Sequence, residues 1–302
     1  MKEINYYSPN TIKDAMTLLV DKAKTSRVFA GGTDLLVQLN VGRRTLDSVI
    51  DIKKINELKT IKHTSDGLIL GASVPCHVIY NDDEIIKKYP GLIDSVSMIG
   101  GTQIQGRASL GGNLCNAAPS ADGVPPLIAL AGECIIAGPS GNRTVSAAEF
   151  CVAPGKTILD SDEFLVSLKI PSPKPNSGSR YIRFIPRNEM DIAVAGAGVS
   201  VELDSEHKRF KNASIVLSAV APIPLVVTKA AEFLIGKEVS NETIEESANI
   251  ARELASPIAD MRGTIDQRKH LVEVFTRRTI VESVSRAKGL GMNTLWHFES
   301  NS

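Results

Sequence analysis

The residues best suited to chemistry lie in two glycine-rich segments. The first reads Ala30-Gly31-Gly32-Thr33-Asp34-Leu35 and separates a strand-like run from a helix-like run. Adjacent glycines permit positive φ angles and let a ligand approach the backbone closely, and the hydroxyl of Thr33 adds a donor. A loop of this kind in front of a helix suits a phosphate group. The alternative is a tight strand-to-helix turn in which Asp34 is the N-cap.

The second segment runs from Ser109 to Asp122 and contains another glycine pair, Gly111-Gly112, beside Ser and Asn side chains. Two such loops can hold a ligand with two phosphates from opposite sides, because backbone amides share its charge and no arginine cluster is needed. This favours a dinucleotide such as FAD. Asp122 suits ribose or ribityl hydroxyls better than phosphate, and capping of a helix expected over 122–131 is an equal alternative.

Other motifs with known chemistry are incomplete or missing. Gly196-Ala197-Gly198 begins a Rossmann-like pattern, but it lies inside an apolar strand and lacks the third glycine. The five histidines and four cysteines are dispersed without CxxC or HxxxH spacing, so reduced thiols and no metal site are predicted. Neither a Gly-x-Ser-x-Gly motif nor a P-loop lysine occurs. We therefore predict no catalytic acid or base and no metal ligand.

The charge balance argues against nucleic acid as a partner. The chain has 34 basic and 34 acidic residues, and its basic residues form no tract longer than pairs such as Arg43-Arg44. Nucleic-acid binding needs a concentrated basic surface. No run approaches the roughly 20 apolar residues of a membrane span, and the first residues lack an apolar signal core. The sequence therefore predicts a cytoplasmic protein.

The elements that must position the two loops alternate between helix and strand. Apolar spacing predicts helices over 11–24, 75–88, 91–99 and 122–131, and strands over 27–30, 48–52, 68–72, 133–137 and 164–170. The segment 171–179, with three prolines and small polar residues, is expected to prevent helix formation and sheet pairing and to act as a linker. Beyond it, strands are expected over 181–184, 192–203 and 213–220, with a hairpin loop at 204–208. Three charged helices follow over 228–235, 241–255 and 266–288, and we expect their charged stripes to be solvated faces.

The two loops resemble the paired flavin motifs of the molybdenum hydroxylase family, which includes xanthine dehydrogenase and carbon monoxide dehydrogenase. The resemblance extends to Asn188-Glu189-Met190-Asp191-Ile192-Ala193 and covers the chain from Tyr6 to about Lys288. It implies an α+β protein: a two-subdomain FAD-binding fold of the PCMH/VAO type, then a C-terminal antiparallel sheet with a three-helix bundle. The expected domains are 1–175, with subdomains of about 1–55 and 56–175, and 176–302.

The resemblance also implies a set of FAD contacts. The first segment would wrap the pyrophosphate and ribityl chain through Val28, Phe29, Ala30, Gly31, Gly32, Thr33, Asp34 and Leu35. On the other side the expected contacts are Ser109, Gly112 and Asn113, with Ile99, Cys115 and Leu165 as apolar or sulfur contacts and Asp122 at hydroxyls. Arg183 would reach the ring edge or the phosphates. Asp191 and Ile192 would shape access to the ring, although Asp191 in a structural salt bridge or turn is the plainer alternative.

By the same resemblance, the chain is the medium subunit of a larger enzyme. Non-covalent FAD would accept electrons from [2Fe–2S] clusters on a small subunit and return them to NAD⁺, a quinone or oxygen. A large subunit would carry molybdopterin, in a dimer of heterotrimers. Two alternatives stay open: a stand-alone FAD-dependent oxidoreductase of the same fold, and a non-catalytic nucleotide-binding assembly module.

Overall fold

The computed structural model describes residues 3–22 and 25–290. The N-terminal part of the protein contains a small parallel sheet. The strand order is β1 (Asn5–Tyr7), β3 (Ser48–Asp51), β2 (Ser26–Phe29). Helix α1 (Ile12–Lys22) packs on this sheet, and helix α2 (Leu35–Asn40) follows β2. The helix predicted over 11–24 therefore begins at Ile12, and its last two residues lie outside the described part of the chain.

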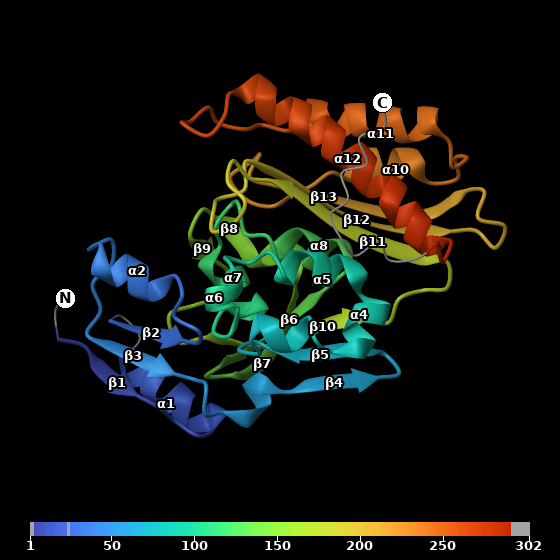
Figure 1. Cartoon of the computed structure of the whole chain (residues 1–302). Helices are drawn as coiled ribbons and strands as arrows, with labels where there is room; N and C mark the ends of the chain where they lie inside the picture. Colours follow the sequence, from blue (N-terminus) through green and yellow to red (C-terminus); the bar gives the residue numbers. More distant parts are fainter. Residues whose placement is uncertain (1–2, 23–24, 291–302) are drawn as a thin grey trace.

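A five-stranded antiparallel sheet forms the middle of the molecule (Figure 1). Its order is β4 (Ile61–Thr64), β5 (Gly67–Gly71), β10 (Phe164–Pro171), β6 (Glu133–Gly138), β7 (Gly141–Ser146). Short helices precede, connect and follow these strands: η1 (Asn56–Lys59), α3 (Cys76–Ile79), α4 (Asp83–Lys88), α5 (Pro90–Val96), α6 (Thr102–Gln105), α7 (Leu110–Asn116), α8 (Val124–Ala129) and α9 (Ala147–Phe150). A two-stranded hairpin, β8 (Cys151–Ala153) and β9 (Lys156–Thr157), precedes β10.

The prediction of one continuous helix over 75–88 is wrong. The segment 75–88 forms two helices, because Asp82 accepts a hydrogen bond from the backbone N–H of Ile85 and so starts α4 anew. The helices expected over 91–99 and 122–131 are real but shorter. Strands β4 and β7 and the β8–β9 hairpin are additional elements. Their half-exposed or very short segments lack the apolar runs from which we predicted the other strands.

The C-terminal sheet is covered on both faces. Its antiparallel order is β11 (Ser177–Phe184), β12 (Ala195–Leu203), β13 (Phe210–Ser218), β14 (Leu225–Val226). Helices α10 (Thr228–Leu234), α11 (Asn241–Leu254) and α12 (Ile265–Ala287) lie on one side, and α5 and α8 lie on the other (Figure 1). The hairpin loop expected at 204–208 joins β12 to β13. The α+β architecture with a C-terminal sheet and three helices is thus confirmed, whereas the division at residues 55 and 175 stays a prediction.

The glycines of β12 serve packing, which accounts for the Rossmann-like pattern noted above. A Cβ on Gly198 would lie 2.8 Å from the backbone carbonyl carbon of Pro125 at the start of α8. A Cβ on Gly196 would lie 2.6 Å from the hydroxyl of Ser218 and 2.8 Å from that of Tyr181. The missing side chain at position 198 lets α8 reach the sheet, and that at position 196 leaves room for side chains of the two neighbouring strands. Both glycines therefore serve packing within and against the sheet.

The expectation that 171–179 prevents sheet pairing is wrong at both ends of the segment. Pro171 pairs with Gly67 at the end of β10, where a missing N–H is tolerated. Ser177, Gly178 and Ser179 form the first part of β11. A Cβ on Gly178 would lie 2.2 Å from the carbonyl oxygen of Ser283 in α12, so its small size admits the helix. Only residues 172–176 connect the two sheets without being part of a strand.

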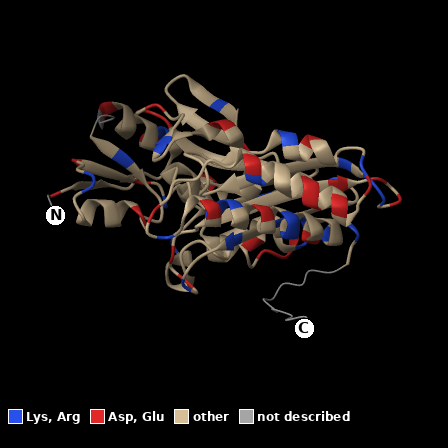
Figure 2. Ribbon diagram, turned by 90° about the horizontal axis from the view of Figure 1, so that it is seen from above, with Lys and Arg blue, Asp and Glu red and all other residues tan. Residues whose placement is uncertain are grey.

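Charged side chains gather on the C-terminal helices. Seen from above, basic and acidic residues alternate along them (Figure 2). Some pair across helices, such as Arg252 of α11 with Glu273 of α12 at 2.9 Å. In the ranges 3–22 and 25–290, no helix combines the length and the apolar character required to cross a membrane.

Candidate functional site

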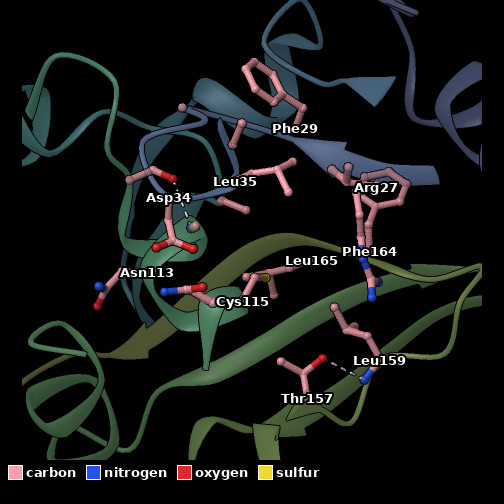
Figure 3. A pocket seen from close by; sticks show the side chains of 18 of the residues that line it. Arg27, Phe29, Asp34, Leu35, Asn113, Cys115, Thr157, Leu159, Phe164 and Leu165 are labelled. Carbon is pink, nitrogen blue, oxygen red and sulfur yellow. Dashed lines mark hydrogen bonds between the residues drawn. The ribbon is translucent and has the colours of Figure 1, made fainter. Parts of the chain in front are cut away.

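A cavity of about 640 Å³ lies between the N-terminal sheet and the middle sheet. Three stretches of chain line it: 26–35, 108–116 and 152–165 (Figure 3). Volumes of about 300–1,000 Å³ are typical of small-molecule and cofactor sites. Fourteen of the residues that the sequence singled out line this cavity: Val28, Phe29, Ala30, Gly31, Gly32, Thr33, Asp34, Leu35, Ile99, Ser109, Gly112, Asn113, Cys115 and Leu165.

The first loop turns at Gly32, whose φ of 74° lies in the left-handed region that favours glycine. A Cβ on Gly31 would lie 1.9 Å from the carbonyl oxygen of Arg107, so the loop rests directly on the chain that precedes the second loop. The backbone N–H groups of the five residues 31–35 have no acceptor in the described chain. Because these residues line the cavity, their donors are available to a ligand.

Asp34 occupies the N-cap position of α2, but its side chain does not cap the helix, so the alternative of a capped turn holds in position only. Its φ and ψ are helical and its side chain makes no capping hydrogen bond. Instead its carboxylate accepts a short hydrogen bond from Gln38, which also donates to Oδ1 of Asn116 at 3.3 Å. Gln38 thereby links α2 to α7 across the cavity wall. The turn at 31–34 leaves its N–H groups uncapped.

Lys53, which does not line the cavity, stabilises the first loop. Its Nζ donates to the carbonyl oxygen of Ala30 at 2.8 Å, pairs with Asp51 at 2.8 Å and lies 4.2 Å from the ring centre of Phe29. Burial opposes ionisation of Asp51, but hydrogen bonds from Lys53 and from the hydroxyl of Tyr6 outweigh it and lower its pKa. The lysine thus holds the carbonyl of residue 30.

The second loop begins helix α7. The hydroxyl of Ser109 accepts from the N–H of Gly112 at 3.0 Å and is the N-cap. Gly112 is helical, and a Cβ there would meet only the Ser109 hydroxyl within 4 Å, so open cavity lies beside it. Oδ1 of Asn113 accepts from the N–H of Gly123 at 3.0 Å. Glycine at 112 therefore keeps space free for a ligand.

The third wall of the cavity was not predicted from the sequence. It consists of the β8–β9 hairpin and residues 157–163, and Arg143 of β7 holds it by two 2.7 Å hydrogen bonds to Glu163 and one to the carbonyl oxygen of Ile158. This contact lowers the pKa of Glu163. Arg27, Gln38, Arg44 and Lys156 also line the cavity and were missed. No motif marks these residues, and only the excess of basic side chains near the first loop was visible in the sequence.

Cys115 faces the cavity from α7 (Figure 3). Its accessible surface opens into the cavity, while surrounding protein and the nearby thiols of Cys134 and Cys151 raise its pKa to about 12. A thiol with this pKa stays protonated near neutral pH and is a poor nucleophile. All four cysteines are free, and no cluster of His, Cys, Asp and Glu suited to a metal occurs in the described ranges.

Asp122 and Arg183 lie outside the cavity lining, and their expected contact with a cofactor stays a prediction. They pair with each other, and the hydroxyl of Tyr181 donates to Asp122 at 2.8 Å. Asp122 does not cap α8 either, since the N-cap position is Gly123. Burial raises the pKa of Asp122 to about 6, against the opposing effect of Arg183. The pair joins the loop before α8 to β11 inside the protein.

Asp191 and Ile192 lie on an exposed loop between β11 and β12, also outside the cavity lining. Asp191 pairs with Arg187 at 3.1 Å and accepts from the N–H of Ile192, which is the structural role considered above. The loop reaches the cavity region through Met190, whose N–H donates to the carbonyl oxygen of Gly100, next to Ile99. The side chain of Ile192 is half exposed to solvent.

Known proteins match the chain over almost its full length. The family described as the FAD binding domain in molybdopterin dehydrogenase matches residues 2–173, and the C-terminal domain of CO dehydrogenase flavoprotein matches 180–283. The putative xanthine dehydrogenase FAD-binding subunit of Escherichia coli K12 is 30% identical, over 94% of this chain and 97% of its own. The carbon monoxide dehydrogenase medium chain of Afipia carboxidovorans is 27% identical, over 94% and 98%.

Solved structures also match the chain over almost its full length. Carbon monoxide dehydrogenase from Hydrogenophaga pseudoflava superposes with a TM-score of 0.90 at 25% identity, covering 94% of this chain and 98% of the other. Quinoline 2-oxidoreductase from Pseudomonas putida superposes with a TM-score of 0.88 at 27% identity, covering 95% and 99%.

Proposed function

Because the chain belongs to the family of FAD-binding subunits of molybdopterin dehydrogenases, we propose that it is the electron-transfer subunit of such an enzyme. In this proposal, electrons arrive from [2Fe–2S] clusters on a small partner subunit and leave to NAD⁺, a quinone or oxygen. A large partner subunit carries molybdopterin and performs the substrate chemistry, and the assembly is a dimer of heterotrimers. The names of the relatives, which are medium chains and FAD subunits of dehydrogenases, support this role.

One observation carries the proposal: the N–H groups of residues 31–35 have no acceptor in the described chain and line a cavity of dinucleotide size. These donors fit a pyrophosphate, whose oxygens need several hydrogen bonds at once. Gly112 lies in the second loop, and its missing side chain leaves the space that such a group requires. The residues present therefore fit FAD.

The chain's own residues bind and orient in this proposal. We assign the pyrophosphate to Gly31, Gly32 and Thr33 on one side and to Ser109 and Gly112 on the other. Ile99, Asn113, Cys115 and Leu165 then contact the flavin or its ribityl chain from the cavity wall. Bound FAD supplies reversible electron transfer, and the protein supplies its position and surroundings. The protonated thiol of Cys115 favours non-covalent binding.

A Gly112→Val variant tests the cavity assignment. Gly112 has an ordinary helical conformation, so valine strains the backbone little, but its methyl groups extend into the cavity beside Ser109. We expect at least a hundred-fold loss of FAD affinity with an unchanged thermal transition of the flavin-free chain. Gly106→Val, at a glycine with nothing within 4 Å, is the matched control. Full flavin occupancy in Gly112→Val would reject the assignment.

Rapid-mixing absorbance of the purified complex tests the electron-transfer role. The flavin band should bleach after substrate is added and recover when an acceptor follows. A flavin that never bleaches during turnover would instead support a non-catalytic nucleotide-binding module. Turnover of a small substrate by the isolated chain would support a stand-alone oxidoreductase.

A further inference from the structure

Helix α2 is apolar on the side that faces solvent as well as on the side that faces the protein. Its inner residues Leu35 and Leu39 pack with side chains of the N-terminal sheet. On the outer side, Leu36, Val37 and the following Val41 are 48%, 57% and 58% exposed, and we call these three residues the α2 face. A helix that is apolar all round is normally buried. The α2 face therefore lacks a cover that residues 3–22 and 25–290 do not supply.

The chain around the α2 face is positively charged, although the whole protein has equal numbers of basic and acidic residues. The first loop and α2 belong to segment 31–46, which contacts segment 101–117 where Gly31 lies against the carbonyl oxygen of residue 107. Together the two segments contain three arginines and one aspartate, namely Arg43, Arg44, Arg107 and Asp34. None of the three arginines pairs with a carboxylate of the described chain. A protein that covers the α2 face must combine apolar side chains with an acidic rim.

A second copy of this chain does not meet that requirement. In a symmetric dimer the same patch faces itself, so the arginines of one copy would lie opposite those of the other. Like charges placed opposite each other across an interface are unfavourable. The occupant of the α2 face is therefore a different subunit.

The position of the α2 face relative to the cavity indicates which subunit this is. Helix α2 lies at the edge of the N-terminal part, away from the C-terminal helices (Figure 1). Leu35 lines the cavity, and Leu36 beside it in sequence belongs to the α2 face. Gln38 of α2 donates to Asn116 in α7, the helix that carries Cys115. A subunit bound to the α2 face is thus next to the wall to which we assigned flavin contacts, which is where an electron donor has to be.

We propose that the α2 face is the docking surface for the [2Fe–2S] subunit, and that this subunit binds it through apolar side chains surrounded by acidic ones. The inference rests on the proposed function, which supplies the electron donor. It adds the place where the donor binds and the chemistry of the donor's surface. The apolar contacts hold the complex together, and the arginines steer the approach of the acidic rim.

The test measures binding of the purified [2Fe–2S] subunit to the full-length, FAD-loaded chain. Val37→Asp places a carboxylate in the α2 face, and we expect at least about thirty-fold weaker binding, the usual loss at a central interface residue. Val281→Asp, at a valine of α12 that is 45% exposed, is the matched control and should leave binding unchanged. FAD content should stay the same in both variants, because neither position lines the cavity.

The acidic rim is tested separately by Arg43→Glu, at an exposed arginine outside the cavity lining. It should weaken binding by about three- to ten-fold at low salt and by less at high salt, because salt screens exposed charges. Without any substitution, the backbone amides of residues 36–41 should exchange their hydrogens more slowly in the complex than in the isolated chain.

The outcomes separate this inference from the proposed function. If the flavin of the unsubstituted complex accepts no electrons from [2Fe–2S] clusters, the proposed function fails. If it does accept them and Val37→Asp binds the [2Fe–2S] subunit normally, or loses only the large subunit, the docking surface is rejected while the electron-transfer role stands. Slower flavin reduction by substrate in Val37→Asp, with normal FAD content and normal reduction by dithionite, supports the docking surface.

Discussion

At the scale of single residues, the first loop depends on a lysine that does not touch the cavity. Lys53 holds the carbonyl of Ala30, and Asp51 and Phe29 hold Lys53 in turn. That carbonyl and the N–H group of Gly31, the first that faces the cavity, belong to one planar peptide, so holding the carbonyl fixes the direction of the N–H group. Lys53 is therefore a positioning residue whose loss acts through the loop.

We expect Lys53→Met to weaken FAD binding by about ten-fold, because one charge-assisted hydrogen bond that fixes the loop is lost. Lys53→Arg should recover most of the affinity, since it keeps the charge and a donor. Flavin fluorescence titration measures both. Lys54→Met, at the exposed neighbouring residue, is the control. An equal loss of FAD affinity in the Met and Arg variants would show that the affinity depends on the shape of the lysine side chain and not on its hydrogen bond to Ala30.

At the scale of elements, the contact of α8 with the C-terminal sheet depends on a missing side chain. Gly198→Ala would place a Cβ 2.8 Å from the backbone of Pro125, which is too close for a carbon atom. We expect the free energy of unfolding to fall by about 1–3 kcal/mol, the usual cost of overpacking. Chemical denaturation measures it. Gly106→Ala should change it by less than about 0.5 kcal/mol, and similar values for both variants would contradict the packing argument.

The loop before α8 also carries a pH-dependent contribution to stability, at Asp122. In the unfolded chain the pKa of an aspartate is about 3.9, and in the folded chain burial raises that of Asp122 to about 6. Between these values the folded state retains a proton that the unfolded state has lost. The contribution of Asp122 to stability therefore decreases as pH rises from about 4 to about 6, and is constant above.

Asp122→Asn removes this titration, so the unfolding free energy of the unsubstituted chain relative to the variant should fall across that window. Denaturation curves collected at several pH values measure the difference. A difference that increases with pH would mean that Arg183 dominates and keeps the carboxylate charged.

The elements also show what the sequence could and could not predict. The loop at 31–34 was singled out because glycine and threonine indicate backbone geometry locally, and most helices and strands followed from apolar spacing. The α+β class with its two-subdomain FAD-binding fold came from the family resemblance. The third wall was missed because the β8–β9 hairpin is short, and only tertiary contacts such as Arg143 with Glu163 bring it to the cavity. Asp122 was expected at the cofactor but lies outside the cavity lining, and a local pattern does not tell which side of a loop its side chain takes.

At the scale of the whole molecule, one carboxylate joins the middle sheet's helices to the C-terminal part. Asp94 of α5 accepts two hydrogen bonds from Arg286 of α12, at 2.6 and 3.0 Å, one from Arg180 at 2.7 Å and one from the N–H of Tyr181 at 3.1 Å. The side chain of Arg286 is 7% exposed. Removing the carboxylate leaves a buried guanidinium without its partner, which is costly.

Asp94→Ala should therefore lower the free energy of unfolding by about 3–5 kcal/mol. Glu273→Ala breaks the exposed pair with Arg252 and should lower it by less than about 1 kcal/mol. Urea denaturation of both variants makes the comparison. A loss in Asp94→Ala no greater than that in Glu273→Ala would show that the two parts are held together by apolar packing alone.

Because helices cover both faces of the C-terminal sheet, the chain is difficult to divide into separately folded fragments. The first family match ends at residue 173 and the second begins at residue 180, which suggests separate expression of the two halves. Yet α5 and α8 pack on one face of that sheet, and Val216 of β13 belongs to the hydrophobic core of the middle sheet. A fragment ending near 173 would expose those helices, and one beginning near 180 would expose the bare face of its sheet. Both fragments would be prone to aggregate, so the two halves are best produced as one polypeptide.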